Sequence, residues 1–119
     1  MRDYKKYDTW KIAHELVKEI YTISENFPKS ELFGLASQIR RAAVSIPTNI
    51  AEGCGRFTDK EFARFLDISI GSTNETEYLL LLSCDLGFTS KDKIADLNAT
   101  LNLTRQKLIQ LRKKLLNNN

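Results

Sequence analysis

The chain has few of the residue types that form catalytic and metal sites. Its 119 residues include one histidine, His14, and two cysteines, Cys54 and Cys84. A catalytic triad would need His14 beside a nucleophile and a carboxylate, and structural zinc takes a full set of Cys and His ligands. We therefore expect no enzyme activity, no metal site and no cofactor. The two cysteines lack metal-ligand spacing, and a domain of this size needs no disulfide, so we expect two free thiols.

Long hydrophobic runs are also absent. No segment approaches the roughly 18 uncharged apolar residues that a membrane span requires, and residues 1–8 are polar. We therefore expect a cytoplasmic protein that does not contact a membrane. The chain has only five glycines and two prolines, and it is 42% hydrophobic and 28% charged. This balance favours a single helical domain over residues 1–119 and excludes disorder.

Hydrophobic periodicity predicts four helices. In each of them, apolar or small residues recur at spacings of three and four, which places them on one side of a helix. The predicted helices span about 9–26, 31–55, 59–86 and 91–116. Because the connections between them are short, neighbouring helices should be antiparallel. We predict an all-α fold, an antiparallel up-down-up-down four-helix bundle.

Capping residues mark the ends of these helices. Thr58-Asp59-Lys60-Glu61 has the capping-box form, in which the Thr hydroxyl and the Glu carboxylate each bind a free amide. Gly87 suits the left-handed position that follows a helix. The other expected N-caps are Asp8, Ser30 and Ser90. Pro47 lies inside the second helix, where it removes one backbone hydrogen bond, so we predict a kink there rather than two separate helices.

The third predicted helix contains four consecutive leucines, Leu79 to Leu82. Four consecutive helical positions point around the whole circumference, so no side of the helix is reserved for water. We expect both faces of this segment to be covered.

The second predicted helix carries a row of polar residues beside its apolar stripe. The row offers groups that make directed hydrogen bonds, in place of the Lys and Glu mixture of a solvated face. Its members are Gln38, Arg41, Ser45, Asn49, Glu52 and Arg56. We interpret the row as a structural network, inside the bundle or at a subunit contact, with a ligand site as the alternative. In such a network Arg41 or Arg56 would pair with Glu52 or with Glu75 of the third helix.

Charge is distributed unevenly in the second half of the chain. Residues 58–87 carry two basic and six acidic side chains, whereas residues 88–119 carry seven basic and two acidic ones. The basic side chains of the fourth helix can simply flank its apolar seam and suit a helix C-terminus. Alternatively, they form a phosphate-binding face. The candidate residues for that face are Arg105, Lys107, Arg112, Lys113 and Lys114.

One long block of sequence resembles a known family. The block consists of Arg-Arg-Ala-Ala-Val-Ser-Ile-Pro at 40–47 and Asn-Ile-Ala-Glu-Gly at 49–53. The further matching positions are Tyr21, Phe27, Pro28, Glu31, Gly34, Leu35, Gln38, Gly71 and Ser72. Together they resemble the bacterial four-helix-bundle proteins encoded in 23S rRNA intervening sequences. The resemblance covers about residues 7–88, and beyond Phe88 only the pattern matches.

The resemblance implies a four-helix bundle that assembles as a ring-like homopentamer. Such an assembly would also cover the second face of the leucine segment. The family is similar to the accessory proteins of diversity-generating retroelements, whose basic pentamers bind nucleic acid and the reverse transcriptase. We therefore predict a non-enzymatic homo-oligomer that binds structured RNA or other nucleic acid through the basic side chains of the fourth helix. The alternative is a scaffold or accessory subunit with a protein partner, which docks on an apolar or acidic surface.

Overall fold

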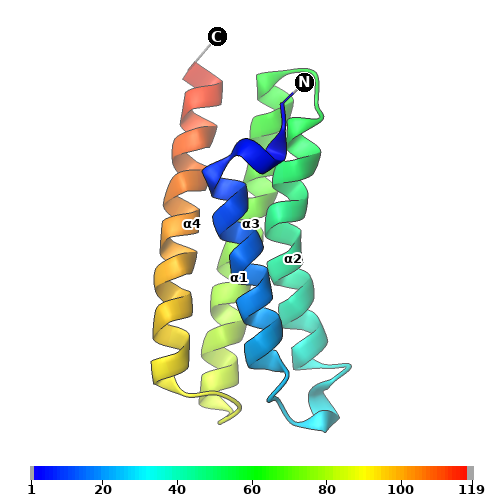
Figure 1. Cartoon of the computed structure of the whole chain (residues 1–119), viewed down its shortest axis with the longest axis vertical. Coiled ribbons are helices and arrows are strands. Elements are labelled where there is room, and N and C mark those ends of the chain that lie inside the picture. The colour runs from blue at the N-terminus through cyan, green and yellow to red at the C-terminus, as the bar shows by residue number, and fades with distance from the viewer. Residues whose placement is uncertain (1, 118–119) are drawn as a thin grey trace.

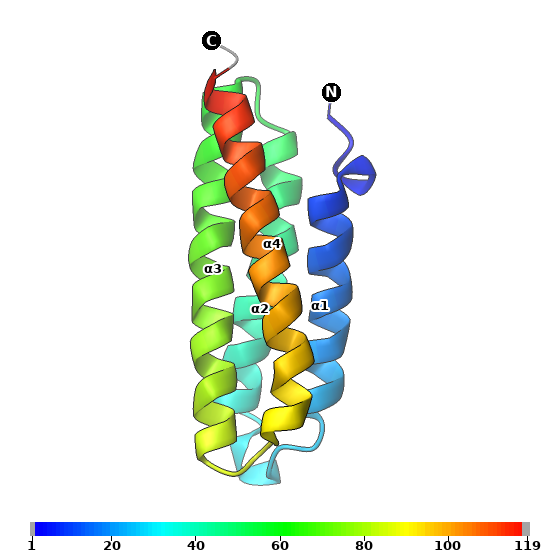
Figure 2. The ribbon, with the colours of Figure 1, turned by 90° about the vertical axis from the view of Figure 1, so that its left-hand side faces the viewer.

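The computed structural model describes residues 2–117 as four long α-helices and two short 3-10 helices (Figure 1). The α-helices span Asp8–Ser24 (α1), Leu35–Cys54 (α2), Asp59–Asp85 (α3) and Lys91–Asn117 (α4). The 3-10 helices span Tyr4–Lys6 (η1) and Lys29–Glu31 (η2). Each α-helix packs on the next along the chain and α1 packs on α4, which closes an antiparallel bundle 48 Å long (Figure 1, Figure 2). The predicted all-α, up-down-up-down bundle is confirmed.

Two predicted helix starts are wrong. Helix α2 begins at Leu35 and not near Ser30, because η2 follows Pro28 and the Glu31 carboxylate accepts a hydrogen bond from the Leu35 amide at 3.0 Å. Helix α1 begins at Asp8 itself, and Tyr7 occupies the N-cap position without a side-chain hydrogen bond. The Asp8 carboxylate therefore lies in the first turn, where the positive end of the helix dipole favours a negative charge.

The other predicted caps are confirmed. Thr58 Oγ1 accepts a hydrogen bond from the Glu61 amide at 3.1 Å, and Gly87 has a φ of +80°. Ser90 Oγ accepts from the amide three residues later at 3.3 Å. Only the Thr half of the capping box forms as predicted, because the Glu61 carboxylate pairs with Arg64 at 3.2 Å.

Helix α2 runs through Pro47 as one helix, as predicted. Proline lacks the amide that would bind the carbonyl four residues earlier. Two side chains donate hydrogen bonds to the carbonyls that directly precede this position. Ser69 Oγ of α3 donates to the Ile46 carbonyl at 2.9 Å, and Asn49 Nδ2 donates to the Ser45 carbonyl at 2.8 Å.

The core runs along the whole bundle axis and includes a row of fully buried hydroxyl groups on α3. Aliphatic residues from all four α-helices form most of the core. Thr73, Thr76 and Ser83 are each 0% exposed, and each hydroxyl donates to the carbonyl four residues earlier at 2.7–2.9 Å. These polar groups are therefore satisfied within their own helix, which removes most of the cost of burying them.

The leucine segment is covered on one side only. Leu79 and Leu80 are buried in the core, Leu82 packs partly against it, and Leu81 is 53% exposed.

Among residues 2–117, both cysteines are free thiols, as predicted. None of the helices in this range is long and apolar enough to cross a membrane.

The contact between the end of α2 and the start of α3 depends on Gly53. A Cβ atom at this position would lie 2.6 Å from Phe62 Cδ1 and 3.0 Å from Phe65 Cβ. We expect Gly53→Ala to lower the free energy of unfolding by about 1–3 kcal/mol, the usual cost of overpacking a core. Urea denaturation at one fixed protein concentration measures the change.

Gly55→Ala is the matched control. Its Cβ would meet only the Glu52 carbonyl oxygen, at 3.4 Å, and the φ of Gly55 is −84°. We expect a change within about 0.5 kcal/mol for this variant. An equal loss for both alanine variants would contradict the close contact at Gly53.

Candidate nucleic-acid interface

Positive charge is concentrated at one end of the bundle. The N-terminal segment, the turn between α2 and α3, and the end of α4 meet there (Figure 1). We call this region, residues 2–6, 55–64 and 112–117, the basic end. It carries nine basic and three acidic side chains, a net charge of +6, whereas the rest of the chain has a net charge of −3.

Two of the five predicted phosphate-binding residues already pair with acidic residues of α3. Arg105 Nη2 lies 3.1 Å from Glu77, and Arg112 Nε lies 2.5 Å from Asp67. Arg105 also donates to Asn74 Oδ1 at 2.9 Å. The acidic third segment and the basic fourth segment of the sequence therefore form a charged seam between α3 and α4. A phosphate would have to compete with these carboxylates.

The three lysines of the predicted face differ in position. Lys113 and Lys114 are exposed at the basic end, whereas Lys107 is half-buried and lies nearly two turns earlier along α4. None of the three has a carboxylate within 4 Å in the described part of the chain. The structure thus brings Arg112, Lys113 and Lys114 together and leaves Arg105 and Lys107 on the side of the bundle.

Arg2 ties the N-terminal segment to the turn between α2 and α3, a role that no motif in the sequence indicates. Its guanidinium donates to the carbonyls of Cys54 and Arg56 at 3.4 and 2.7 Å and to Asp59 Oδ1 at 2.6 Å. It also lies 4.8 Å from the centre of the Phe62 ring. Arg2 therefore binds the last carbonyl of α2, that of Cys54, where the helix end carries partial negative charge, and one carbonyl of the following turn.

The segment tied down by Arg2 covers Cys54. The Tyr7 ring contacts the Phe62 ring edge-to-face at 5.9 Å, and the Cys54 side chain beneath is 2% exposed. Burial raises the pKa of the Cys54 thiol to about 11, against a smaller lowering by the positive charge of Arg2. Only a small fraction of this thiol is therefore in the nucleophilic thiolate form at neutral pH.

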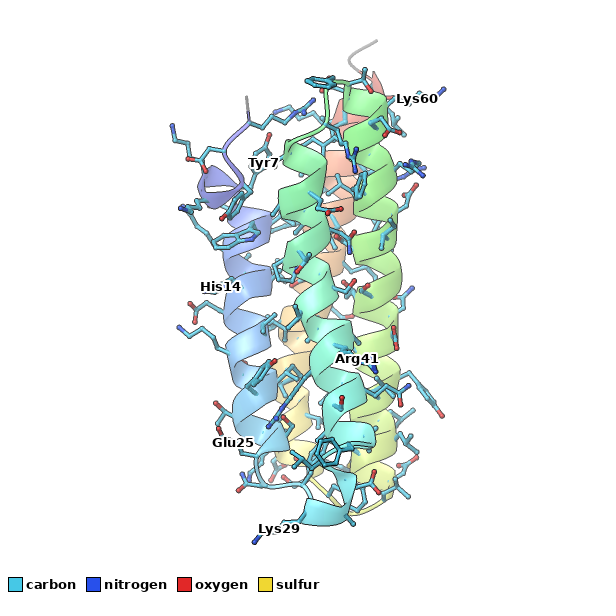
Figure 3. All side chains as sticks on the ribbon, turned by 90° about the vertical axis from the view of Figure 1, so that its right-hand side faces the viewer. Tyr7, His14, Glu25, Lys29, Arg41 and Lys60 are labelled. Carbon is cyan, nitrogen blue, oxygen red and sulfur yellow. The ribbon has the colours of Figure 1, made fainter. Side chains whose placement is uncertain are left out.

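The remaining cations of the basic end lie on its outer surface. The guanidinium of Arg56 lies 4.5 Å from the centre of the Phe65 ring, and the residue is exposed. Lys60 is exposed and projects outward from the end of the molecule (Figure 3). Arg64 pairs with Glu61 at 3.2 Å. Like Lys113 and Lys114, Arg56 and Lys60 have no carboxylate within 4 Å among residues 2–117.

The polar row of α2 forms a network only at its centre. Ser45 and Asn49 are half-buried and joined by a hydrogen bond of 3.0 Å, and Ser72 Oγ of α3 donates to Ser45 Oγ at 2.7 Å. The other members of the row are exposed: Gln38, Arg41, Glu52 and Arg56.

The ion pairs predicted for this row do not form within the chain. In the part of the chain that the structure describes, neither Arg41 nor Arg56 lies within 4 Å of Glu52 or Glu75. All four residues are exposed, and the Arg56 guanidinium packs on the Phe65 ring instead of pairing with a carboxylate. A subunit contact remains the interpretation of the outer part of the row.

A groove between α1 and α2 lies beside the polar row. It consists of two adjoining hollows that share Val44 and Thr48. At one end the Trp10 and His14 rings stack at 4.9 Å, and at the other the Arg40 guanidinium lies 4.8 Å from the Tyr21 ring. His14 therefore packs on an aromatic ring. Among residues 2–117, no group of His, Cys, Asp and Glu side chains is placed to hold a metal ion.

Most of the chain matches the model of one protein family. The family model described as 23S rRNA-intervening sequence protein matches residues 5–110. No curated protein matches the chain. The matched range includes the block at 40–53 on α2, which packs on α3, and it also covers most of α4.

Arg2→Gln tests whether Arg2 holds the N-terminal segment over Cys54. Release of the segment would expose the thiol, lower its pKa and speed its alkylation by iodoacetamide at pH 8 several-fold. Loss of the positive charge without release would raise the pKa and slow alkylation, so the sign of the change separates the two cases. Mass spectrometry of the Cys54 peptide measures the rate.

Lys6→Gln removes a charge from the same segment and serves as the control, because the described part of the chain places no carboxylate within 4 Å of Lys6. Its alkylation rate should equal that of the unmodified chain. A slower or unchanged rate for Arg2→Gln would mean that residues 2–7 stay in place without Arg2.

Proposed function

The chain belongs to the 23S rRNA-intervening sequence protein family, and we propose that it is a non-enzymatic homo-oligomer that binds structured RNA or other nucleic acid. The observation that carries this proposal is the separation of charge, with +6 at the basic end and −3 over the rest of the chain. Polyanions approach such a molecule preferentially at the basic end, because the rest of the chain carries a net negative charge.

Phosphate contacts at the basic end account for binding. Lys113 and Lys114 lie there without carboxylate partners in the described chain, and Lys107 extends the positive surface along α4. Arg105 and Arg112 can join them, because ion pairs at a protein surface contribute only about 0–1 kcal/mol and a phosphate can replace the carboxylate. Contacts of this kind recognise charge and shape rather than sequence.

Gly71 supports assembly with further copies of the chain. A glycine inside a helix costs about 1 kcal/mol relative to alanine, and among the described residues no atom beyond its chain neighbours and the adjacent backbone of α3 lies within 4 Å of the place where its Cβ would be. Packing within the bundle therefore gives no reason for this glycine. Close approach of another backbone does give a reason.

The residues around Gly71 fit a contact between copies. Ile68, Gly71, Glu75 and Tyr78 recur at spacings of three and four on the outer side of α3, with Ile68 45% and Tyr78 58% exposed. This stripe would pack on the groove between α1 and α2 of the next copy, where Arg41 offers a positive charge for Glu75. A contact between two different faces forms a ring when the rotation between copies closes, and an open filament when it does not. The family resemblance implies five copies.

A protein partner is the second candidate ligand. Leu32, Phe33 and Leu86 are 50%, 92% and 54% exposed in the connections at the end opposite the basic end (Figure 1). Exposed apolar side chains gathered at one end of a molecule are typical of a docking surface for protein. A pull-down from nuclease-treated lysate separates the candidates, since a protein partner would survive the removal of RNA.

Light scattering tests assembly with Gly71→Arg. The new side chain finds open space within the chain, so we expect an unchanged helical circular dichroism spectrum and a shift from the oligomer to the monomer. Ala99→Arg places the same side chain on the exposed side of α4 and should leave the oligomer intact. A monomeric unmodified chain, or an oligomer that tolerates arginine at position 71, would contradict the proposed contact.

A salt series tests nucleic-acid binding. Fluorescence anisotropy with a labelled RNA hairpin should give an affinity that falls as salt rises, and Lys113→Gln/Lys114→Gln should reduce the slope of log K against log salt by up to about 1.8 per chain. The control is Lys91→Gln/Lys93→Gln at the other end of the same helix, which should keep the slope. Absence of binding at low salt would contradict the proposed function.

A further inference from the structure

Phe57 is the least buried large apolar side chain that the structure describes. It lies in the turn between α2 and α3 and is 98% exposed. Most phenylalanines of a folded protein are buried, because removal of the ring from water is favourable. Nothing in residues 2–117 covers this ring, so its position does not serve the stability of the bundle.

Two cations without a carboxylate within 4 Å in the described chain flank the exposed ring in the sequence. Arg56 precedes Phe57, and its guanidinium is fixed 4.5 Å from the centre of the Phe65 ring. Lys60 follows in the first turn of α3 and projects from the same end of the molecule (Figure 3). A hollow lies directly beside Phe57, lined by Arg2, Cys54 and Arg56. The turn therefore combines an aromatic face, an adjoining hollow and positive charge.

We propose that Phe57 stacks on an unpaired base of a single-stranded segment of nucleic acid. Arg56 and Lys60 hold the phosphates on either side of that base. The inference rests on the proposed function and adds to it a second kind of contact, which distinguishes single strands from duplexes. Base stacking on an aromatic ring tolerates any sequence, because every base has a flat face, and positive charge beside the ring follows the backbone.

Charge and shape favour this ligand over a membrane surface. Within the described residues of the basic end, Phe57 is the one large apolar side chain that is more than one-third exposed. Insertion into a bilayer needs an apolar face with several such residues. A single exposed ring beside unpaired cations fits a nucleotide segment, in which the ring can contact one base and the cations can contact the two phosphates next to it.

Fluorescence anisotropy with a labelled 12-nucleotide single strand and a 12-base-pair duplex tests the inference. Phe57→Ala should weaken binding of the single strand about 5-fold or more, the equivalent of one lost base stack, and should leave duplex binding unchanged. The slope of log K against log salt should stay the same, because no phosphate contact is lost. Phe57→Trp should retain the affinity.

Phe33→Ala is the matched control. Phe33 is 92% exposed in the connection between α1 and α2, at the opposite end of the bundle. The substitution removes the same ring from a connection where Lys29 is balanced by Glu25 and Glu31, without net positive charge, so single-strand binding should not change. In Phe57→Trp the new indole fluorescence should be quenched when the single strand is added, whereas in Phe33→Trp it should not.

Three results would overturn the inference. Equal single-strand affinity of Phe57→Ala and the unmodified chain would remove the stacking role and leave the proposed function standing. Absence of any binding by the unmodified chain at low salt would remove both. Binding to phosphatidylglycerol vesicles that depends on Phe57, with oligonucleotide binding that does not, would assign the ring to a lipid surface instead.

Discussion

The close packing of α2 on α3 is the constraint on which the other features of the bundle depend. Because Gly53 has no side chain, Phe62 can approach the end of α2 closely. Ser69 of α3 also donates a hydrogen bond to the carbonyl of Ile46, which lies 23 residues earlier in the chain. These contacts fix the register of the two helices. The turn between them is consequently held at the end of the molecule, with Phe57 outside the core.

Antiparallel packing also determines where charge accumulates. Alternating helix directions bring the first residues, the turn between α2 and α3 and the end of α4 to one end (Figure 1). In the seam between α3 and α4, Arg105 pairs with Glu77 and Arg112 pairs with Asp67, so part of the opposite charge of the two helices cancels there. At the basic end, ion pairs neutralise only some of the positive side chains. The cations that stay unpaired there are the reason for placing the nucleic-acid site at this end.

Periodicity and capping residues sufficed to predict the fold, because the apolar spacing and the signals at Thr58, Gly87 and Ser90 agree with one another. The start of α2 was predicted wrongly because Ser30 is of a residue type that favours the N-cap position. In the structure, the Glu31 side chain accepts the hydrogen bond from the first amide of the helix instead. The net charge of each sequence segment indicated that α3 is acidic and α4 is basic. It did not indicate their ion pairs, because these join residues that are 28 and 45 positions apart in the sequence. The sequence did not indicate that Phe57 is exposed, because phenylalanine is normally expected in the core.

The central claim is that one end of the bundle contacts nucleic acid. Photo-cross-linking with a single strand that contains 4-thiouridine, followed by mass spectrometry of the peptides, measures this contact directly. The account predicts cross-links within residues 55–64 and 112–117. Cross-links confined to the opposite end, around Phe33 and Lys91, or spread evenly over the surface would contradict it.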